Sequence, residues 1–487
     1  MNNVENAPPA RPPAEPEQYD LVILGSGTGS KFLAWTFAEQ GQRVATVERK
    51  YLGGSCPNIA YLPSKNIIHS AKIASYFRRS REFGIMADSF SVNMSAVRDR
   101  KRRMVSDLVD LHREKYQRSG GELILGSGRF ITPRTVEVTL PAGSTRRLRG
   151  TNVVISTGTH ARVEPIPGLA ESQPLTHVEA LELDETPRHL IVIGGGYVGL
   201  ELSQAMRRFG SDVTVIDRND RLVHQEEDDV TEALHQLFAD EGIDLVLNAR
   251  LQRISGRAGQ RVQVSLVQGG HGGVERTIEG THLLAASGRA PNTEGIGLDL
   301  AGVELTSDGY VKINARLETT APGVWAVGDV TGGLKFTHIS FDDFHVIRDN
   351  INGGNHVTTG RQVPFCLFTD PELARIGRSE RQARAQGIAY RLFKIPMAEV
   401  LRARTLAETR GFLKALVEVG GERILGFTAF GADVGEIMSA VQIAMIAGLP
   451  YTKLRDAVLT HPTMMEGLIG LFSSASSPAI RSAHSNA

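Results

Sequence analysis

The chain has 487 residues, with 54 basic and 54 acidic side chains and a formal net charge of zero. A chain of this length can form three domains of ordinary size, and its balanced charge offers no basic surface for nucleic acid or an anionic membrane. Only two cysteines occur, which excludes a disulfide scaffold and indicates a reducing compartment.

No apolar run approaches the roughly 20 residues needed to cross a bilayer, and the N-terminus has no basic segment followed by an apolar one. We therefore expect a soluble, cytoplasmic protein whose partners are small molecules, with no nucleic-acid partner, no membrane partner and no metal site. Residues 1–18 hold five prolines and almost nothing apolar. They cannot bury enough surface to offset the entropy of ordering, so we expect a disordered tail.

Residues 19–48 carry the pattern of a dinucleotide-binding fold. The apolar run 19–24 predicts a buried parallel strand, a glycine turn and a helix to about Gln40 follow, and a second strand ends on Glu48. Gly25 permits the tight turn and Gly27 lets the backbone approach a pyrophosphate, while Glu48 accepts from ribose hydroxyls. Ser30 replaces the third glycine and still allows close helix packing. Alone, this motif is weak.

The stretch from Gly53 to Lys65 closely resembles the active-site segment of the flavoprotein disulfide reductases, the family of dihydrolipoamide dehydrogenase, glutathione reductase and mercuric reductase. In that family two cysteines separated by four residues begin a helix beneath a flavin. Here Cys56 stands in the place of the interchange thiol, and Tyr61 stands in the place of the second cysteine. The resemblance therefore implies a flavoenzyme without the family's usual disulfide relay.

A run of charged residues, 98–103, follows on a predicted helix from Ser95 to Gln117. We interpret this run as a solvated helix face.

A second fingerprint begins at residue 189, where an apolar run leads into Gly194, Gly196 and Gly199 and a later strand ends on Asp217. The interval from Gly194 to Asp217 is 23 residues, as is the interval from Gly25 to Glu48. Two complete fingerprints at matched spacing predict two dinucleotide sites. In the family that the chain resembles, the first holds FAD and the central one holds NADH or NADPH.

The identity of the second nucleotide stays open. Asp217 favours the free 2′-hydroxyl of NADH because a carboxylate repels a 2′-phosphate. Arg218 and His224, however, lie near positions where NADPH-using relatives carry cations. We favour NADH and keep NADPH as the alternative.

The resemblance continues to about residue 472 and implies an α/β fold with two Rossmann-like domains and a C-terminal α+β dimerisation domain. We expect a tail at 1–18, an FAD domain at 19–167 and 288–358, an NAD(P) domain at 168–287, a dimerisation domain at 359–472 and a flexible tail at 473–487. Cys366 lies in an apolar strand of the dimerisation domain and is interpreted as a core residue. The resemblance assigns cofactor contacts to Gly25, Gly27, Ser30, Glu48, Gly54, Ser55, Lys65, Thr157, Gly158, Gly194, Gly196, Tyr197, Gly199, Asp217, Arg218, Gly288, Arg289, Gly328, Asp329 and Thr337.

The resemblance also assigns catalytic roles to Cys56, Tyr61, Lys65, Glu201, His461 and Glu466. In the family, a histidine oriented by a glutamate reaches across the dimer to the interchange thiol; His461 and Glu466 match that motif. A lysine paired with a glutamate lies beside the flavin, where its ammonium stabilises negative charge. Tyr197 matches the tyrosine that covers the nicotinamide pocket.

Three functions are compatible with these residues. The first is an FAD-dependent NAD(P)H oxidoreductase acting on a non-disulfide acceptor such as a quinone, a conjugated small molecule, a metal ion, oxygen or another pyridine nucleotide. The second is a single-thiol reductase in which Cys56 cycles through a mixed disulfide or sulfenate. The third is a non-enzymatic flavin redox sensor. The usual lipoamide or glutathione reduction is disfavoured because a phenol forms no disulfide, and mercury reduction because residues 473–487 contain no cysteine.

Overall fold

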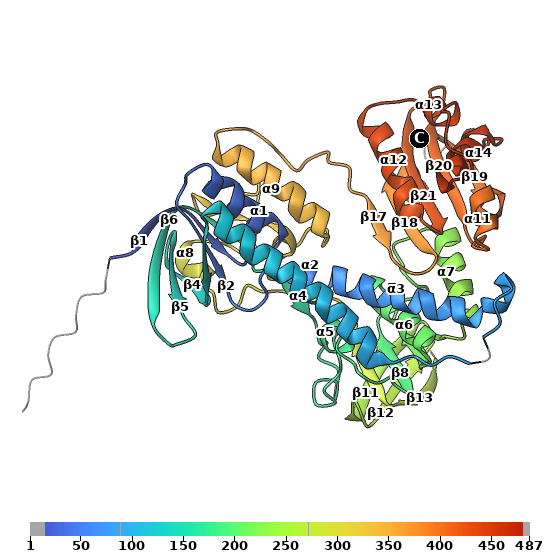
Figure 1. Ribbon diagram of the computed structural model, residues 1–487, viewed down its shortest axis with the longest axis horizontal. Coiled ribbons are helices and arrows are strands. Elements are labelled where there is room, and N and C mark those ends of the chain that lie inside the picture. Colours follow the sequence, from blue (N-terminus) through green and yellow to red (C-terminus); the bar gives the residue numbers. More distant parts are fainter. Residues whose placement is uncertain (1–14, 88, 271, 481–487) are drawn as a thin grey trace, which may run out of the picture. The chain divides into compact units, whose positions relative to one another are not determined.

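The computed structural model describes residues 15–87, 89–270 and 272–480 (Figure 1). Most of the predicted N-terminal tail lies outside the described residues, but strand β1 begins within it, at Glu17. The chain forms two compact units. The first comprises the residues up to Asn58, Ser106–His160 and Ala290–Thr359, and the second comprises Ile59–Val105, Ala161–Arg289 and the residues from Gly360 onward.

The first unit is built on a seven-stranded sheet. Its parallel strands are β1 (Glu17–Leu24), β2 (Val44–Glu48), β3 (Glu122–Leu125), β6 (Thr145–Ile155) and β16 (Val324–Ala326), and β4 (Ser127–Thr132) and β5 (Thr135–Thr139) extend it beyond β6 in antiparallel fashion. In the strand order β3-β2-β1-β6, β1 lies beside β6 in parallel, so the C-terminal ends of these two strands meet at the same edge of the sheet. Side chains of β1 from Leu21 to Leu24 are at most 3% exposed, as a central parallel strand requires.

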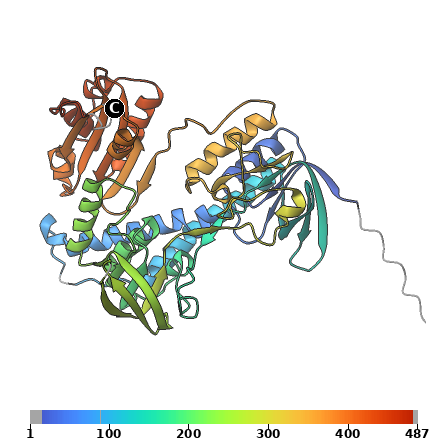
Figure 2. The same cartoon turned by 180° about the vertical axis from the view of Figure 1, so that it is seen from behind.

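Helix α1 (Thr28–Glu39) follows β1 directly, and α9 (Thr337–Ile351) lies beside it in both views of the ribbon (Figure 1, Figure 2). The pair packs through aromatic side chains, with Phe32 at 4.8 Å from Phe341 and 5.7 Å from Phe344 between ring centroids. The first unit also holds α2 (Ser55–Asn58) and α8 (Leu298–Ala301), and it receives the second half of the long helix α4 (Met94–Ser119).

The second unit contains the second dinucleotide fold. A four-stranded parallel sheet has the order β10-β9-β8-β14, and α6 (Tyr197–Phe209) follows β8 as α1 follows β1. A three-stranded antiparallel sheet accompanies it. The bounds are β8 (His189–Ile193), β9 (Asp212–Ile216), β10 (Asp244–Val246), β11 (Ala249–Arg257), β12 (Arg261–Gln268), β13 (Val274–Gly280), β14 (His282–Ala285), α3 (Tyr61–Arg78), α5 (His177–Ala180) and α7 (Asp228–Asp240).

The C-terminal part of the second unit is an antiparallel sheet of order β17-β18-β21-β20-β19 covered by helices. Strand β21 has no exposed residue, since all eight of its positions are buried. The bounds are β17 (Phe365–Leu367), β18 (Glu372–Gly377), β19 (Tyr390–Pro396), β20 (Phe412–Glu418), β21 (Ile424–Gly431), α10 (Glu380–Ala385), α11 (Leu401–Thr405), α12 (Val434–Ile446), α13 (Tyr451–Arg455) and α14 (Gly467–Ser473). Strands β7 (Thr159–Ala161) and β15 (Arg289–Pro291) lie where the chain leaves one unit for the other.

The expectation of an α/β chain with two dinucleotide folds and a C-terminal α+β domain is confirmed. Two local expectations differ from the structure. Lys101, in the charged run on α4, is 1% exposed and its ammonium pairs with Glu182, because the helix packs against the segment after α5 instead of facing water. Toward the C-terminus, Ile480 exchanges two backbone hydrogen bonds with Tyr390 of β19, so the described part of the segment after Ser473 is ordered by edge pairing.

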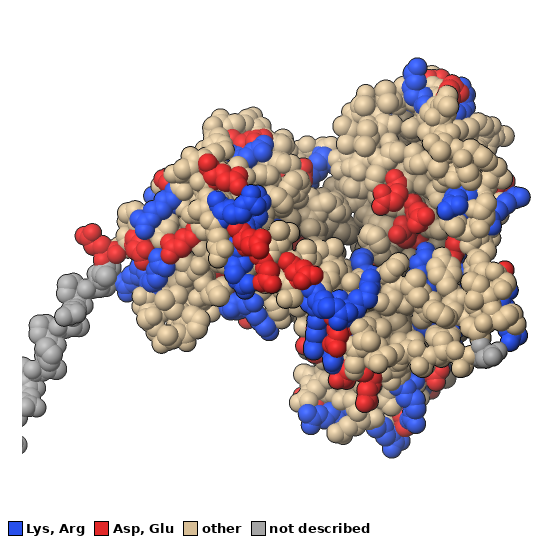
Figure 3. Space-filling model, in the orientation of Figure 1, with Lys and Arg blue, Asp and Glu red and all other residues tan. Residues whose placement is uncertain are grey.

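Basic and acidic side chains are interspersed on the face of the molecule shown in Figure 3, in keeping with the net charge of zero. Among the residues that the structure describes, no helix is long and apolar enough to span a membrane.

Candidate active site and nucleotide pocket

The turn between β1 and α1 is shaped for close approach of a ligand. Gly25 has φ +96°, and a Cβ there would lie 2.3 Å from the carbonyl oxygen of Ser156, so only glycine fits. A Cβ on Gly54 would lie 2.7 Å from the Cα of Gly27, which shows how closely the active-site loop covers the turn. Ser30 is fully buried and its hydroxyl donates to the carbonyl oxygens of Gly25 and Gly27, at 2.9 and 3.0 Å.

Glu48 organises the loops around this turn. Its Oε2 accepts from the backbone N–H and the hydroxyl of Ser26, at 2.9 and 2.7 Å, and its Oε1 accepts from the backbone N–H groups of Lys50 and Tyr51. Because each carboxylate oxygen has two lone pairs and both are held from the protein side, the group is fixed in place at the end of β2. This is the end-of-strand position that the fingerprint's acid occupies, and here its four acceptor sites hold the surrounding loops.

Buried hydroxyls in the first unit lack protein partners where a cofactor would supply them. The Oγ1 atoms of Thr157 and Thr337 are buried without a hydrogen bond, although buried polar groups are nearly always satisfied. The hydroxyl of Thr159 donates to Oδ2 of Asp329 at 2.8 Å. Together with the glycine turn, these residues fit FAD.

Hydrogen bonds from one side chain to the backbone hold the Cys56 segment. Asn58 donates from Nδ2 to the carbonyl oxygens of Leu52 and Gly54, at 2.9 and 2.7 Å, closing the loop around α2. Cys56 is partly buried and carries a free thiol. Ser55 and Gly54 precede it as the resemblance requires.

In the second unit, α3 begins at Tyr61, where the family's second cysteine would stand, and carries Lys65 one turn later. Nζ of Lys65 lies 2.7 Å from Oε2 of Glu201 on α6, and it lies 5.9 Å from the ring centroid of Tyr61 and 4.7 Å from that of Phe368. The other oxygen of Glu201 accepts from the backbone N–H of Phe368 at 2.9 Å. The expected Lys65–Glu201 pair is therefore formed in a largely apolar setting.

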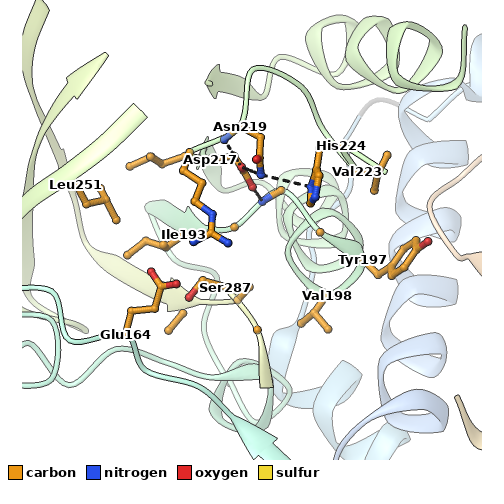
Figure 4. Close-up of a pocket in the computed structure, with 18 of the residues that line it drawn as sticks. Glu164, Ile193, Tyr197, Val198, Asp217, Asn219, Val223, His224, Leu251 and Ser287 are labelled. Carbon is orange, nitrogen blue, oxygen red and sulfur yellow. Dashed lines mark hydrogen bonds between the residues drawn. The ribbon is translucent and has the colours of Figure 1, made fainter. Parts of the chain in front are cut away.

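A cavity of about 520 Å³ lies at the second fingerprint, entirely within the second unit. Figure 4 shows Tyr197 at one end and Leu251 at the other, with Asp217, Asn219 and His224 along one side. Other lining residues include Gly194, Gly196, Arg218, Arg250, Ser287, Gly288 and Arg289. Gly194 has φ +113°, and a Cβ on Gly199 would meet the Gly194 carbonyl oxygen at 2.0 Å, so α6 packs too closely against the turn for any residue but glycine at position 199.

Asp217 is held much as Glu48 is. Its Oδ2 accepts from the backbone N–H of Gly195 at 2.5 Å, and its Oδ1 accepts from the backbone and side chain of Asn219, both at 2.8 Å. Ser287 and His177 also line the cavity, and the buried atoms Ser287 Oγ and His177 Nε2 have no hydrogen-bond partner in the protein. The cavity thus combines a fixed acid with unsatisfied polar atoms, and it fits a pyridine nucleotide.

Tyr197 is tied to the C-terminal sheet through a buried carboxyl group. Its hydroxyl lies 3.5 Å from Oε1 of Glu226, and Oε2 of Glu226 lies 3.7 Å from Nε of Arg375 on β18. Burial raises the pKa of Glu226 and, more strongly, that of Tyr197. Arg375 lies 4.4 Å from the ring centroid of Phe365, which itself packs near Tyr197.

The expected contact between His461 and Glu466 near the C-terminus is formed. Nδ1 of His461 lies 3.0 and 3.1 Å from the two oxygens of Glu466, and the side chain of His461 is 64% exposed. The backbone N–H of Thr463 and then His461 hold the pKa of Glu466 below its usual range, so the carboxylate stays charged and fixes the imidazole's orientation.

Some lining residues carried no sequence signal. His177, Glu226 and Arg250 come from separate segments of the second unit, none within a recognisable motif, and only folding brings them to the cavity. Burial lowers the pKa of His177 to about 4, helped by the charge of Arg289. Within the described residues, no group of three or more His, Cys, Asp or Glu could hold a metal ion.

A glycine cradle that fits FAD, a second dinucleotide cavity and a charged lysine–glutamate pair define a flavin-dependent pyridine nucleotide oxidoreductase. The chain belongs to the pyridine nucleotide-disulphide oxidoreductase family, which it matches over residues 19–343, and to the family's dimerisation domain, which it matches over residues 363–470. Members of this family are FAD-dependent and use NAD(P)H.

Relatives of known name cover nearly the whole chain. The chain is 36% identical over 461 residues to the probable pyridine nucleotide-disulfide oxidoreductase RclA of Escherichia coli, covering 94% of this chain and 99% of RclA. It is 31% identical to the mercuric reductase of Staphylococcus aureus, covering 92% and 81%. The solved Cu(II) complex of the HOCl-induced flavoprotein disulfide reductase RclA superposes with a TM-score of 0.85 at 34% identity, covering 94% of this chain and 99% of that one.

Proposed function

We propose that this flavoprotein passes hydride equivalents from NAD(P)H through FAD to an acceptor that is not a disulfide, and that it does so without a redox-active disulfide. Tyr61 carries this proposal, because a phenol neither forms a disulfide nor accepts electrons from one. The only other cysteine, Cys366, lies in β17, where burial raises the pKa of its thiol and keeps it protonated. Both cysteines are free.

The chain's own side chains support direct transfer. Bound FAD supplies the two-electron carrier between the nucleotide and the acceptor. Glu201 orients Lys65 through their 2.7 Å ion pair, and by resemblance to the family this ammonium stabilises negative charge at the flavin. Tyr197, at one end of the nucleotide cavity, would cover the nicotinamide pocket until the nucleotide displaces it.

NADH is the proposed nucleotide, because Asp217 presents a fixed carboxylate where a 2′-phosphate would be repelled. Arg218, Arg250 and His224 also line the cavity. The charges of Arg218 and Arg250 leave NADPH as the alternative donor.

The acceptor class is a quinone, a conjugated small molecule or another pyridine nucleotide. Metal ions belong among the acceptors to be tested, because one solved relative is a Cu(II) complex and others are named mercuric reductases.

A second candidate is a single-thiol reductase in which Cys56 forms a mixed disulfide or sulfenate. The formed His461–Glu466 pair favours it, because an oriented imidazole can deprotonate a thiol. No contact among the described residues specifically favours the remaining alternative, a non-enzymatic flavin sensor.

We propose a homodimer in which His461 reaches Cys56 of the partner subunit. Three apolar residues near the end of α12 support an interface there, since Ile443, Ile446 and Leu449 are 66%, 67% and 42% exposed.

We further propose that the protein is cytoplasmic, and that its FAD domain comprises residues 19–167 and 288–358, its NAD(P) domain 168–287 and its dimerisation domain 359–472.

The experiment is a screen of NADH and NADPH oxidation against quinones, a dye acceptor, Cu(II), Hg(II), lipoamide and glutathione disulfide. We expect turnover with organic acceptors and none with the disulfides, and we expect Cys56→Ser to retain the quinone activity. Turnover on lipoamide would refute direct transfer. Loss of quinone activity in an FAD-loaded Cys56→Ser variant would favour the single-thiol enzyme, and no turnover on any acceptor would favour the sensor.

A further inference from the structure

Two polar side chains of the nucleotide cavity have no partner in the protein. His177 is 7% exposed, and its Nε2 is buried without a hydrogen bond. Oγ of Ser287 is buried and unpaired in the same way, and both residues line the cavity of about 520 Å³. Buried polar atoms are nearly always paired, because an unpaired one costs free energy. Two such atoms in one cavity wall therefore indicate a ligand that supplies their partners.

The strand order places both residues on one side of the glycine turn that follows β8. In the four-stranded sheet, β8 lies between β9 and β14, and the three strands are parallel. Ser287 comes two residues after the end of β14. Leu175 pairs with Leu284 of β14 in parallel, so His177, two residues later, reaches the same carboxyl edge of the sheet. Both side chains therefore stand at the β14 end of the cavity's sheet edge.

Asp217 stands on the other side of that turn, because it follows β9. A Cβ on Gly194 would lie 3.1 Å from the Cα of Ser287. A Cβ on Gly195 would instead lie 3.1 Å from Oδ2 of Asp217. In the view of Figure 4, Ile193 at the end of β8 lies between Asp217 and Ser287. The turn is thus flanked by the acid on one side and by the serine on the other.

This division assigns the two halves of a pyridine nucleotide. In a fold of this kind the acid at the end of the second strand holds the adenosine ribose, and the pyrophosphate lies on the glycine turn at the helix N-terminus. The nicotinamide half then continues on the far side of the turn, where Ser287 and His177 stand. Its first group after the pyrophosphate is a ribose with two hydroxyl groups.

The chemistry of the two side chains fits hydroxyl groups better than phosphate. Burial, and then the charge of Arg289, lower the pKa of His177 to about 4, so the imidazole is neutral at pH 7. One nitrogen of a neutral imidazole donates and the other accepts, and the hydroxyl of Ser287 can do both. Neutral groups of this kind match ribose hydroxyls, whereas phosphate is bound most strongly by cations.

We propose that His177 and Ser287 bind the ribose on the nicotinamide side of the nucleotide and hold it beside the glycine turn. Each side chain turns about its own torsions to bring its polar atom from the cavity wall to a ribose hydroxyl. The hydrogen bonds that form satisfy both unpaired atoms. This assignment depends on the proposed function, in which a pyridine nucleotide occupies the cavity.

The test compares three ligands that grow by one group at a time, ADP, ADP-ribose and NAD⁺, on the oxidised, FAD-loaded protein. Isothermal calorimetry gives each dissociation constant without turnover, because none of the three carries a hydride to transfer. His177→Phe keeps an aromatic ring in the cavity wall. We expect it to bind ADP as the wild type does, and to bind ADP-ribose and NAD⁺ about fivefold more weakly, the effect of one lost hydrogen bond. Ser287→Ala should give the same pattern.

Two controls separate a ligand contact from a general change in the fold. Ser211→Ala removes another buried, unpaired hydroxyl, directly before β9 and outside the cavity lining, and it should change none of the three constants. Asp217→Ala, on the adenosine side, should weaken all three. The nucleotide-free His177→Phe and Ser287→Ala proteins should melt no lower than the wild type, because each change removes an unpaired polar atom from the empty cavity wall.

Equal weakening of all three ligands in the His177→Phe and Ser287→Ala proteins would overturn the proposal, and so would affinities unchanged from the wild type. A loss confined to NAD⁺ would also overturn it, because the contact would then lie at the nicotinamide ring. Failure of the proposed function looks different. A wild-type protein that binds none of the ligands contradicts that function and this inference with it, whereas a wild type that binds all three beside unaffected variants contradicts only the ribose contact.

Discussion

Removing Lys65 should destabilise the protein by leaving a carboxylate buried and uncompensated. The side chain of Glu201 is 7% exposed and would keep only the backbone N–H of Phe368 as a partner. Losing one member of a buried ion pair costs about 3–5 kcal/mol, and because Lys65 is itself 26% exposed we expect the low end, about 3 kcal/mol. The second unit, which holds both residues, has about 300 residues. With an unfolding entropy of about 2.1 cal/mol/K per residue, a loss of about 3 kcal/mol corresponds to a fall of roughly 5 °C in thermal midpoint.

The assay is scanning calorimetry of Lys65→Met, Glu201→Leu and the double variant in excess FAD. The double variant should be more stable than Lys65→Met, because it no longer buries a lone carboxylate. Lys312→Met is the control, since it breaks a pair of similar length, 2.8 Å, whose members are 58% and 61% exposed, and it should shift the midpoint by little. The reasoning is refuted if Lys65→Met melts like the wild type, or if the double variant melts no higher than Lys65→Met.

Three further outcomes are expected. Asp217→Ala should weaken NADH binding and move the preference toward NADPH with FAD retained, whereas a variant that lost FAD but kept its nucleotide preference would mean that the two sites are exchanged; difference spectra and kinetics with both nucleotides measure this. Light scattering at micromolar concentration should show a dimer that Ile446→Glu weakens, and a monomer that turns over would contradict the proposed assembly. The pKa of His177 is about 4 in the folded protein and 6.5 in the unfolded chain. Its contribution to folding stability is therefore full above pH 6.5 and falls toward pH 4, because the unfolded chain takes up the proton first. His177→Gln should make that fall in thermal midpoint shallower, and an unchanged slope would count against a neutral, buried imidazole.

Local rules of the chain predicted the dinucleotide folds because their signals lie within about 25 residues of each other. Position 25 must be glycine because the turn leaves no room for a Cβ, and the acid that holds the turn must stand at the end of the next strand. Both features can therefore be recognised from the sequence without the fold. The pairs Lys65–Glu201 and His461–Glu466 were predicted from the resemblance, and the structure brings each together.

What the sequence did not reveal depends on contacts between distant segments. Nζ of Lys31 lies 2.6 Å from Nε2 of His112, but the two residues are 81 apart in the sequence, and neither lies in a motif whose spacing specifies the other. The charged run on α4 was interpreted as solvated because charge runs usually are, but Lys101 meets Glu182 of a segment 81 residues later. The Ser-rich segment near the C-terminus has no periodic pattern of apolar residues that would predict a strand. Ile480 nevertheless pairs with Tyr390, because β19 is an edge strand whose backbone groups are available for hydrogen bonds.

The number of electrons the protein stores tests the central claim most directly. Anaerobic dithionite titration of freshly thiol-reduced protein should consume one two-electron equivalent per FAD, with no long-wavelength charge-transfer band in the intermediate, because Tyr61 leaves neither a disulfide nor a thiolate against the flavin. Tyr61→Cys is the positive control and, once oxidised to the disulfide, should take up a second equivalent and develop the band. Two equivalents per FAD in the wild-type protein would reveal a hidden redox centre and contradict direct transfer.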